Sequence, residues 1–250
     1  MNAIPLEQEI EYPTSDGQPM AETTLHRKIM SDLIQGLDLR YLEVPDVWVG
    51  GNLFLCYEKG NPAAHRAPDV LLAKGVKKWD RPNYLLWEET PPSLVVEVTS
   101  RKTRREDQGD KKALYERIGV EEYVLFDPYG DYLRPRLQGY RLEGGRYQPI
   151  PLAEDGTLLS RTTGLIFRPE GRRLRLVDAV TGEPLPWPEE LEVALTQEAA
   201  ARRAAQAARR AEAAARRAAE AAAAEEEAAR RSAEERVRTL EAELERLRKG

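Results

Sequence analysis

The C-terminal segment constrains the folding of this chain more than any other part of it. From Glu189 to Lys249 it contains neither glycine nor proline, and alanines alternate with arginines and glutamates. This pattern predicts one long helix, because nothing in it interrupts helical periodicity. At a rise of 1.5 Å per residue, such a helix would extend for roughly 90 Å. A domain with a hydrophobic core must therefore come from the residues before it.

This segment also repeats itself every seven residues. Arginine pairs recur at this interval, with one unit skipped, at Arg202-Arg203, Arg209-Arg210, Arg216-Arg217 and Arg230-Arg231. The 3-4-3 spacing of Val237, Leu240, Leu244 and Leu247 is typical of a coiled-coil seam. We therefore expect a partner helix from a second copy, which predicts a homodimer joined by the tail. The alternative is a solitary, solvated, alanine-rich helix.

Proline and glycine divide the chain into three parts. Residues 1–20 contain three prolines and a Ser-Asp-Gly turn, which predicts an extended arm. Prolines 184, 186 and 188 mark the start of the tail. The sequence thus predicts an arm over 1–20, a folded domain over 21–187 and a coiled-coil tail over 188–250.

Composition excludes several classes of protein. The net charge of −5 over 250 residues is unlike that of proteins that bind nucleic acid through bulk positive charge. A single cysteine excludes an internal disulfide and a cysteine-based zinc site, and only two histidines are present. The sequence has no uninterrupted apolar run of about 18 residues and no secretory signal at its start, so we expect a cytoplasmic protein without a membrane span.

The order of predicted elements indicates the fold class. A helix is expected over 25–37, capped by Thr23 or Thr24, and a hairpin over 47–57 with its turn at 50–52. Short apolar runs predict buried strands at 70–73, 94–98 and 122–126. A second helix is expected over 107–119, ending at its glycine. This order predicts an α/β or α+β domain, in which helices flank a mixed central sheet.

Two acidic residues interrupt these apolar strands. Asp69 begins one strand directly after Pro68, and Glu97 lies inside another among valines. Because an unpaired buried carboxylate costs several kcal/mol, each needs a metal, a cation or a proton as partner. Two such acids on neighbouring strands predict a site for Mg²⁺ or Mn²⁺. The alternatives are a turn-forming Pro-Asp pair at Asp69 and a structural ion pair between Glu97 and an arginine.

A lysine on the following helix completes the candidate site. Lys111 shares one helix face with Leu114, Tyr115 and Ile118, whereas Lys112 is turned about 100° away. Lys111 is therefore expected to point inward, where it could orient a nucleophilic water and offset charge on a phosphate. The alternative is a surface lysine whose stem lies along apolar side chains.

These residues together resemble a known family. Ala67-Pro68-Asp69-Val70, Pro92 through Ser100 and Asp107 through Tyr115 resemble the motifs of Uma-type bacterial endonucleases, within the PD-(D/E)XK, restriction-endonuclease-like superfamily. The passage Gly119-Val120-Glu121-Glu122-Tyr123 and the following Phe126-Asp127-Pro128 are similar as well. The resemblance covers residues 22–185, and leaves out the arm and the tail. It implies a restriction-endonuclease-like fold and a Mg²⁺-dependent endonuclease.

The resemblance also implies roles for single residues. Asp69 matches the acid of the Pro-Asp motif and Glu97 that of the Glu-X-Lys element, so both would bind the metal together with the backbone carbonyl of Val98. The sequence departs from the superfamily at Thr99, where the motif has lysine. In the Uma-type branch that lysine is expected from the next helix, at Lys111. Glu22 is a weaker candidate for a further acid from the first helix.

Nucleic-acid binding would need a local basic patch. One cluster follows the first acidic strand at Lys74, Lys77, Lys78 and Arg81, and another follows the second at Arg101, Lys102, Arg104 and Arg105. We expect both to face phosphates, with solvated loops as the alternative. Trp79 and Trp87 are candidates for base stacking, although a core role is more common.

The sequence therefore predicts a metal-dependent endonuclease acting on DNA, with RNA not excluded. The alternative from another class is an inactive nucleic-acid-binding or scaffolding module that acts through its coiled-coil tail.

Overall fold

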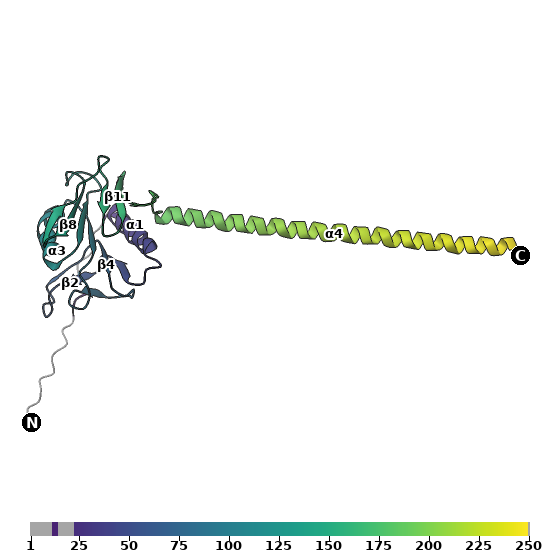
Figure 1. The fold of residues 1–250 in the computed structure, drawn as a ribbon, viewed down its shortest axis with the longest axis horizontal. Coiled ribbons are helices and arrows are strands. Elements are labelled where there is room, and N and C mark those ends of the chain that lie inside the picture. The colour runs from purple at the N-terminus through teal and green to yellow at the C-terminus, as the bar shows by residue number, and fades with distance from the viewer. Residues whose placement is uncertain (1–11, 15–22, 250) are drawn as a thin grey trace, which may run out of the picture. The chain divides into compact units, whose positions relative to one another are not determined.

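A six-stranded mixed sheet forms the centre of the protein. The computed structural model describes residues 12–14 and 23–249 (Figure 1). In spatial order the central strands are β1 (Val47–Gly50), β4 (Val70–Lys74), β6 (Leu94–Val98), β7 (Glu122–Phe126), β8 (Leu137–Glu143) and β9 (Arg146–Pro149). Within this six-stranded sheet, β6 and β7 pair in parallel and the other neighbouring pairs are antiparallel. The predicted mixed α/β class is confirmed.

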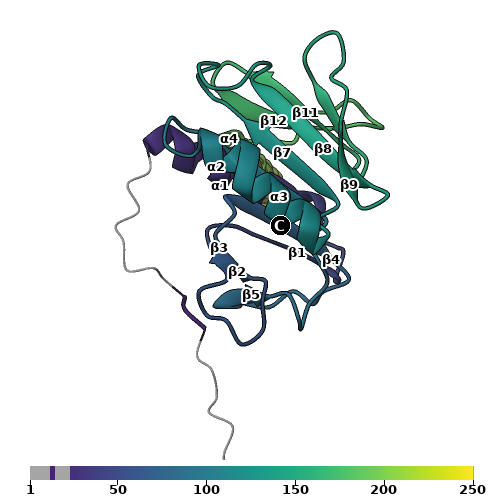
Figure 2. The same cartoon turned by 90° about the vertical axis from the view of Figure 1, so that its left-hand side faces the viewer.

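The central strands are buried because both faces of the sheet are covered. On one face, α1 (Thr24–Arg40) packs with a small sheet of β10 (Leu158–Ser160), β11 (Leu165–Glu170) and β12 (Arg173–Asp178). On the other face lie α3 (Lys112–Ile118) and a small sheet of β3 (His65–Arg66), β2 (Phe54–Cys56) and β5 (Asn83–Leu85). In Figure 2, β2, β3 and β5 are seen below α3, and β11 and β12 above it. Burial on two faces explains why the strands at 70, 94 and 122 are apolar apart from Glu97 and Glu122.

The connection between β6 and β7 is helical, as a parallel pair requires. It consists of α2 (Arg104–Glu106), the π-helical turn η1 (Asp107–Lys111) and α3. The helix ends at Gly119, whose φ of 86° suits glycine. The second predicted helix is therefore present, but it begins three residues earlier and contains a wider turn.

The first predicted helix is present as α1. Its N-cap is Thr23, whose hydroxyl accepts a hydrogen bond from the backbone N–H of His26 at 3.2 Å. Ile29, Leu33 and Leu37 are fully buried, as the four-residue spacing predicts.

The predicted hairpin over 47–57 is wrong. β1 pairs with β4, whereas β2 pairs with β3 and β5 in another sheet. The chain between them packs against the segment before β4: Asn52 N–H donates to Pro68 O at 2.8 Å. A Cβ on Gly51 would lie 2.1 Å from the carbonyl oxygen of Asp69, so close backbone approach explains this glycine better than a turn does.

The tail forms a single continuous helix, α4 (Pro188–Lys249). Contacts divide the chain into two compact units, Met1–Glu189 and Glu190–Gly250. Within the first unit, the Trp187 ring contacts two guanidinium groups, those of Arg173 at 3.5 Å and Arg175 at 3.3 Å. Arg173 also bridges Asp32 of α1 and Glu189. Across residues 12–14 and 23–249, no helix has the length and apolar character that a membrane crossing needs.

Candidate active site

Strand pairing brings the two predicted acids together. β4 and β6 are antiparallel, with Val70 opposite Val96. Asp69 and Glu97 therefore come next to each other, where β4 begins and β6 ends. The carboxylate of Asp69 accepts a hydrogen bond from the backbone N–H of Val98 at 2.7 Å. His26 Nε2, from the first turn of α1, lies 3.1 Å from Asp69 Oδ1. Helix α1 and both strands thus meet at Asp69.

Glu97 is buried beneath this edge, with 1% of its surface exposed. Tyr115 donates its hydroxyl proton to Oε1 at 2.9 Å, and Lys111 Nζ donates to Oε2 at 2.9 Å. Burial raises the pKa of Glu97 to about 8. The negative charges of Asp69 and Asp107 also raise it, and the Lys111 ammonium opposes them.

Lys111 connects Glu97 to a third carboxylate. It lies 3.0 Å from Asp107 Oδ1, one turn earlier on the same helix, and Asp107 is as buried as Glu97. Burial alone would lower the pKa of Lys111, but Glu97 and Asp107 raise it above its ordinary value. Burial raises the pKa of Asp107, and the Lys111 ammonium opposes this effect. The inward orientation predicted for Lys111 is therefore observed.

The oxygen atoms in this cluster are of the kind that binds a hard divalent cation. Among the described residues, Lys111 is the one lysine or arginine in ion-pair contact with Asp69, Glu97 or Asp107. Three carboxylates share one ammonium, and repulsion from neighbouring carboxylates adds to the effect of burial in raising the pKa values of Glu97 and Asp107. Carboxylate and carbonyl oxygens are the ligands that Mg²⁺ prefers. Within the described ranges, no three His, Cys, Asp or Glu side chains are grouped so that they could hold a metal by themselves.

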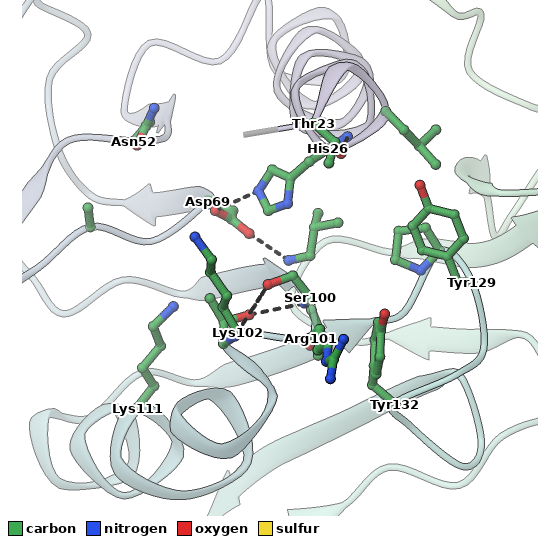
Figure 3. Close-up of a pocket in the computed structure, with 16 residues that line it drawn as sticks. Thr23, His26, Asn52, Asp69, Ser100, Arg101, Lys102, Lys111, Tyr129 and Tyr132 are labelled. Atoms are coloured by element: carbon green, nitrogen blue, oxygen red, sulfur yellow. Dashed lines mark hydrogen bonds and ion pairs between the residues drawn. The ribbon is translucent and has the colours of Figure 1, made fainter. Parts of the chain in front are cut away.

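A pocket of about 470 Å³ opens over Asp69 and Lys111 (Figure 3). Besides Lys111 and the chain at Asn52 and just before β4, three regions line it: the start of α1, the end of β6 with the segment after it, and the loop that follows β7. The second region supplies Val98, Ser100, Arg101 and Lys102, and the third supplies Tyr129 and Tyr132. The pocket is large enough for a small-molecule-sized group.

The structure brings only one of the two predicted basic clusters to this pocket. Arg101 and Lys102 line it, Arg104 lies beside the ring of Tyr132 at 6.0 Å, and Arg105 is exposed. The other cluster follows the far end of β4, because β4 runs antiparallel to β6. There Lys74 donates to the carbonyl of Thr162, Lys78 donates to the carbonyls of Tyr41 and Leu42, and Lys77 is exposed.

Other predicted positions lie elsewhere. Trp79 is 56% exposed beside Arg81, and Trp87 packs on Tyr12 with ring centroids 4.8 Å apart. Neither tryptophan lines the pocket. Glu22 and the arm, apart from residues 12–14, lie outside the described residues.

Sequence reasoning assigned no role to four side chains that contact or line the site: His26, Asp107, Tyr129 and Tyr132. Asp107 had a usable signal, because it precedes Lys111 by four residues on one helix. The two tyrosines had none, since their loop reaches the pocket only through the pairing of β6 with β7.

Comparison with known proteins identifies the family. The sequence profile of the Uma2 family, described as "Putative restriction endonuclease", matches residues 2–178. The chain belongs to this family. The resemblance drawn from the sequence motifs is therefore confirmed, and Uma2 membership supports a nuclease function. A solved structure described as a "putative nuclease belonging to DUF820" from Anabaena variabilis is similar at 12% identity, with a TM-score of 0.42, over 57% of this chain and 75% of that one. A search of curated proteins finds no significant match.

Proposed function

We propose that this Uma2 protein is a divalent-metal-dependent endonuclease that hydrolyses phosphodiester bonds in DNA. The observation that carries the proposal is the convergence of Asp69, Glu97 and Lys111 from three separate elements at one edge of the sheet. Family membership supports the class of reaction. The geometry supports our assignment of that reaction to these three residues.

Asp69, Glu97 and the backbone carbonyl of Val98 would hold Mg²⁺ or Mn²⁺. When bound, the cation would polarise the scissile phosphate and lower the pKa of a water molecule. Asp107 would remain with Lys111, since those two residues already form an ion pair within the helix. This arrangement gives each of the buried carboxylates a partner of opposite charge.

Lys111 would orient the attacking water and compensate negative charge on the phosphate. Its ammonium is held by two carboxylates and lines the pocket, so it can donate a hydrogen bond toward that space. Arg101 and Lys102 would contact neighbouring phosphates at the rim. Because they bind phosphate rather than bases, they would accept RNA as well as DNA.

Titration of Mn²⁺ into the full chain tests the metal site. Calorimetry should detect binding by the wild type and its loss in Asp69→Asn and Glu97→Gln. Glu154→Gln is a matched control, because Glu154 is an exposed acid on a turn away from the pocket. Supercoiled plasmid incubated with the same proteins should be nicked by the wild type and the control alone. Wild-type protein that binds no metal would refute the catalytic proposal and favour the scaffolding alternative.

We infer that α4 joins two copies of the chain. Val237, Leu240 and Leu244 follow coiled-coil spacing, and more than half of each side chain is exposed in the isolated chain. Sedimentation equilibrium should give a dimer for the wild type and a monomer for the double variant Leu240→Glu, Leu244→Glu. The double variant Glu241→Gln, Glu243→Gln controls for changes that lie nearby but outside the leucine seam. A wild-type monomer would contradict this inference.

A further inference from the structure

Two tyrosines form a wall of the pocket to which the cleavage reaction assigns no role. Tyr129 and Tyr132 follow β7, the parallel neighbour of the strand that carries Glu97. In Figure 3 they stand on the side of the pocket opposite Asp69 and Lys111. Tyr129 is 47% exposed, so its ring is available to a ligand rather than buried in the core.

A buried carboxylate fixes the loop that carries these rings. Asp127 is fully buried and accepts three backbone hydrogen bonds, from Tyr129 at 3.0 Å, Tyr132 at 2.6 Å and Leu133 at 3.0 Å. Such bonds fix the loop backbone at both tyrosines before any ligand arrives. A wall fixed in this way loses little conformational entropy on binding.

Each ring also has an arginine beside it. The guanidinium carbon of Arg172 lies 5.1 Å from the Tyr129 ring centroid, and that of Arg104 lies 6.0 Å from the Tyr132 centroid. Aromatic rings that accept base faces, next to arginines that attract the backbone, are the combination by which proteins bind single-stranded nucleic acid. In a duplex, base faces are stacked on one another and only base edges are accessible in the grooves.

We propose that Tyr129 and Tyr132 stack on an unpaired nucleobase, so that the substrate is a single-stranded or locally unpaired region of nucleic acid. This inference rests on the proposed function and specifies its substrate class. An unpaired nucleotide would place its base against the tyrosine wall, while the adjoining phosphate lies toward Asp69 and Lys111. The pocket volume suits one such nucleotide.

Binding measurements in a Glu97→Gln background test this without cleavage. The probes are a fluorescein-labelled DNA single strand, the RNA strand of the same sequence, and the matching DNA duplex, followed by anisotropy. We expect the DNA strand to bind at least fivefold more tightly than the duplex. The RNA strand shows whether the site distinguishes ribose from deoxyribose. The proposal concerns unpaired bases and allows either sugar.

Substitutions locate the source of that preference. The double variant Tyr129→Ala, Tyr132→Ala should weaken single-strand binding by about tenfold or more, with duplex binding almost unchanged. The double variant Tyr129→Phe, Tyr132→Phe keeps the rings and should keep the affinity. Trp79→Ala is the control, since this exposed tryptophan lies outside the pocket.

Equal or tighter duplex binding would overturn the inference, as would an equal loss in the phenylalanine variant or in Trp79→Ala. These results are separable from failure of the proposed function. Plasmid nicking with a duplex preference would leave the nuclease proposal intact and remove the inference. Single-strand binding that depends on the tyrosines, without any cleavage by the wild type, would support unpaired-base binding and refute the nuclease proposal.

Discussion

Two buried glutamates at opposite ends of the parallel strand pair show how differently one residue type can be used. Glu122 begins β7, and Glu97 lies near the end of β6. Glu122 accepts hydrogen bonds from the Arg141 guanidinium at 2.8 Å, the Ser160 hydroxyl and the Arg161 backbone N–H. Glu97 has Tyr115 and a lysine that it shares with Asp107.

The difference lies in compensation of charge. Glu122 has a guanidinium partner of its own and two further donors, so its cluster is complete without a ligand. The Glu97 cluster has more carboxylates than cations, an imbalance that the proposed divalent ion would offset. A buried acid is therefore a better indicator of function when its protein partners do not balance its charge than when it is merely buried.

Neutralising each glutamate in turn should produce opposite results. Glu97→Gln should lower metal-dependent cleavage at least ~100-fold while leaving stability close to that of the wild type, because it removes a carboxylate from an acidic cluster. Glu122→Gln should reduce the free energy of unfolding by about 3 kcal/mol, because Arg141 loses its charged partner. Plasmid nicking and urea unfolding measure the two effects. Equal losses of activity from equally stable variants would contradict the comparison.

Removing Lys111, which Glu97 and Asp107 share, should increase the excess of carboxylates over cations in this cluster. In EDTA, Lys111→Met should lower the free energy of unfolding by about 2–3 kcal/mol, because Glu97 and Asp107 lose their common cation. Mn²⁺ should restore more stability to this variant than it adds to the wild type, since it binds only the folded cluster. Thermal melts with and without Mn²⁺ check both points. The matching change Lys112→Met alters the next residue, which lies on the Tyr140 ring instead, and should show no such dependence on the metal.

The pH dependence of stability should also reveal the burial of Glu97. The pKa of Glu97 is raised by burial from 4.5 to about 8, so between these values the folded state binds a proton that the unfolded state has released. Stability of the metal-free protein should therefore fall as pH rises through that window. Glu97→Gln should remove this part of the fall, whereas Glu154→Gln should not. Urea midpoints at several pH values give the comparison, and parallel curves for the wild type and Glu97→Gln would contradict it.

Hydroxyl deletions should give the smallest effects. Tyr115→Phe removes one hydrogen bond to Glu97 and should cost about 1 kcal/mol, whereas Ser160→Ala removes a donor to Glu122 and should cost about 2 kcal/mol. The larger value is expected because Ser160 is fully buried and its hydroxyl oxygen also accepts a hydrogen bond from the Thr163 backbone N–H. Urea unfolding resolves the difference, and a larger loss for Tyr115→Phe would reverse the order proposed here.

Local patterns were sufficient to predict most of the site. Asp69 and Glu97 stand out because acids rarely interrupt apolar strands, and helical spacing alone separates Lys111 from Lys112. These signals depend on residues near one another in sequence. They remain valid in the folded protein because strand and helix geometry fixes where each side chain points.

Features that depend on pairing between distant segments were not predictable in the same way. The glycines at 50 and 51 suggested a hairpin turn, but one of them allows close approach to the backbone of Asp69. Lys74 and its neighbours were expected near Arg101 because both follow strands, and nothing local indicates that β4 and β6 are antiparallel. Tyr129 and Tyr132 reach the pocket through the same kind of long-range pairing.

The π-helical turn at Asp107–Lys111 has a consequence for protein engineering and for aligning related chains. A π-helical turn contains about one residue more than an α-helical turn, so a single deletion there could restore regular winding. Such a deletion would remove the wider turn without rotating the helix that follows, so related chains can keep an inward lysine while differing by one residue in this segment. Alignments that count residues from Glu97 to the lysine should therefore allow a gap at this turn.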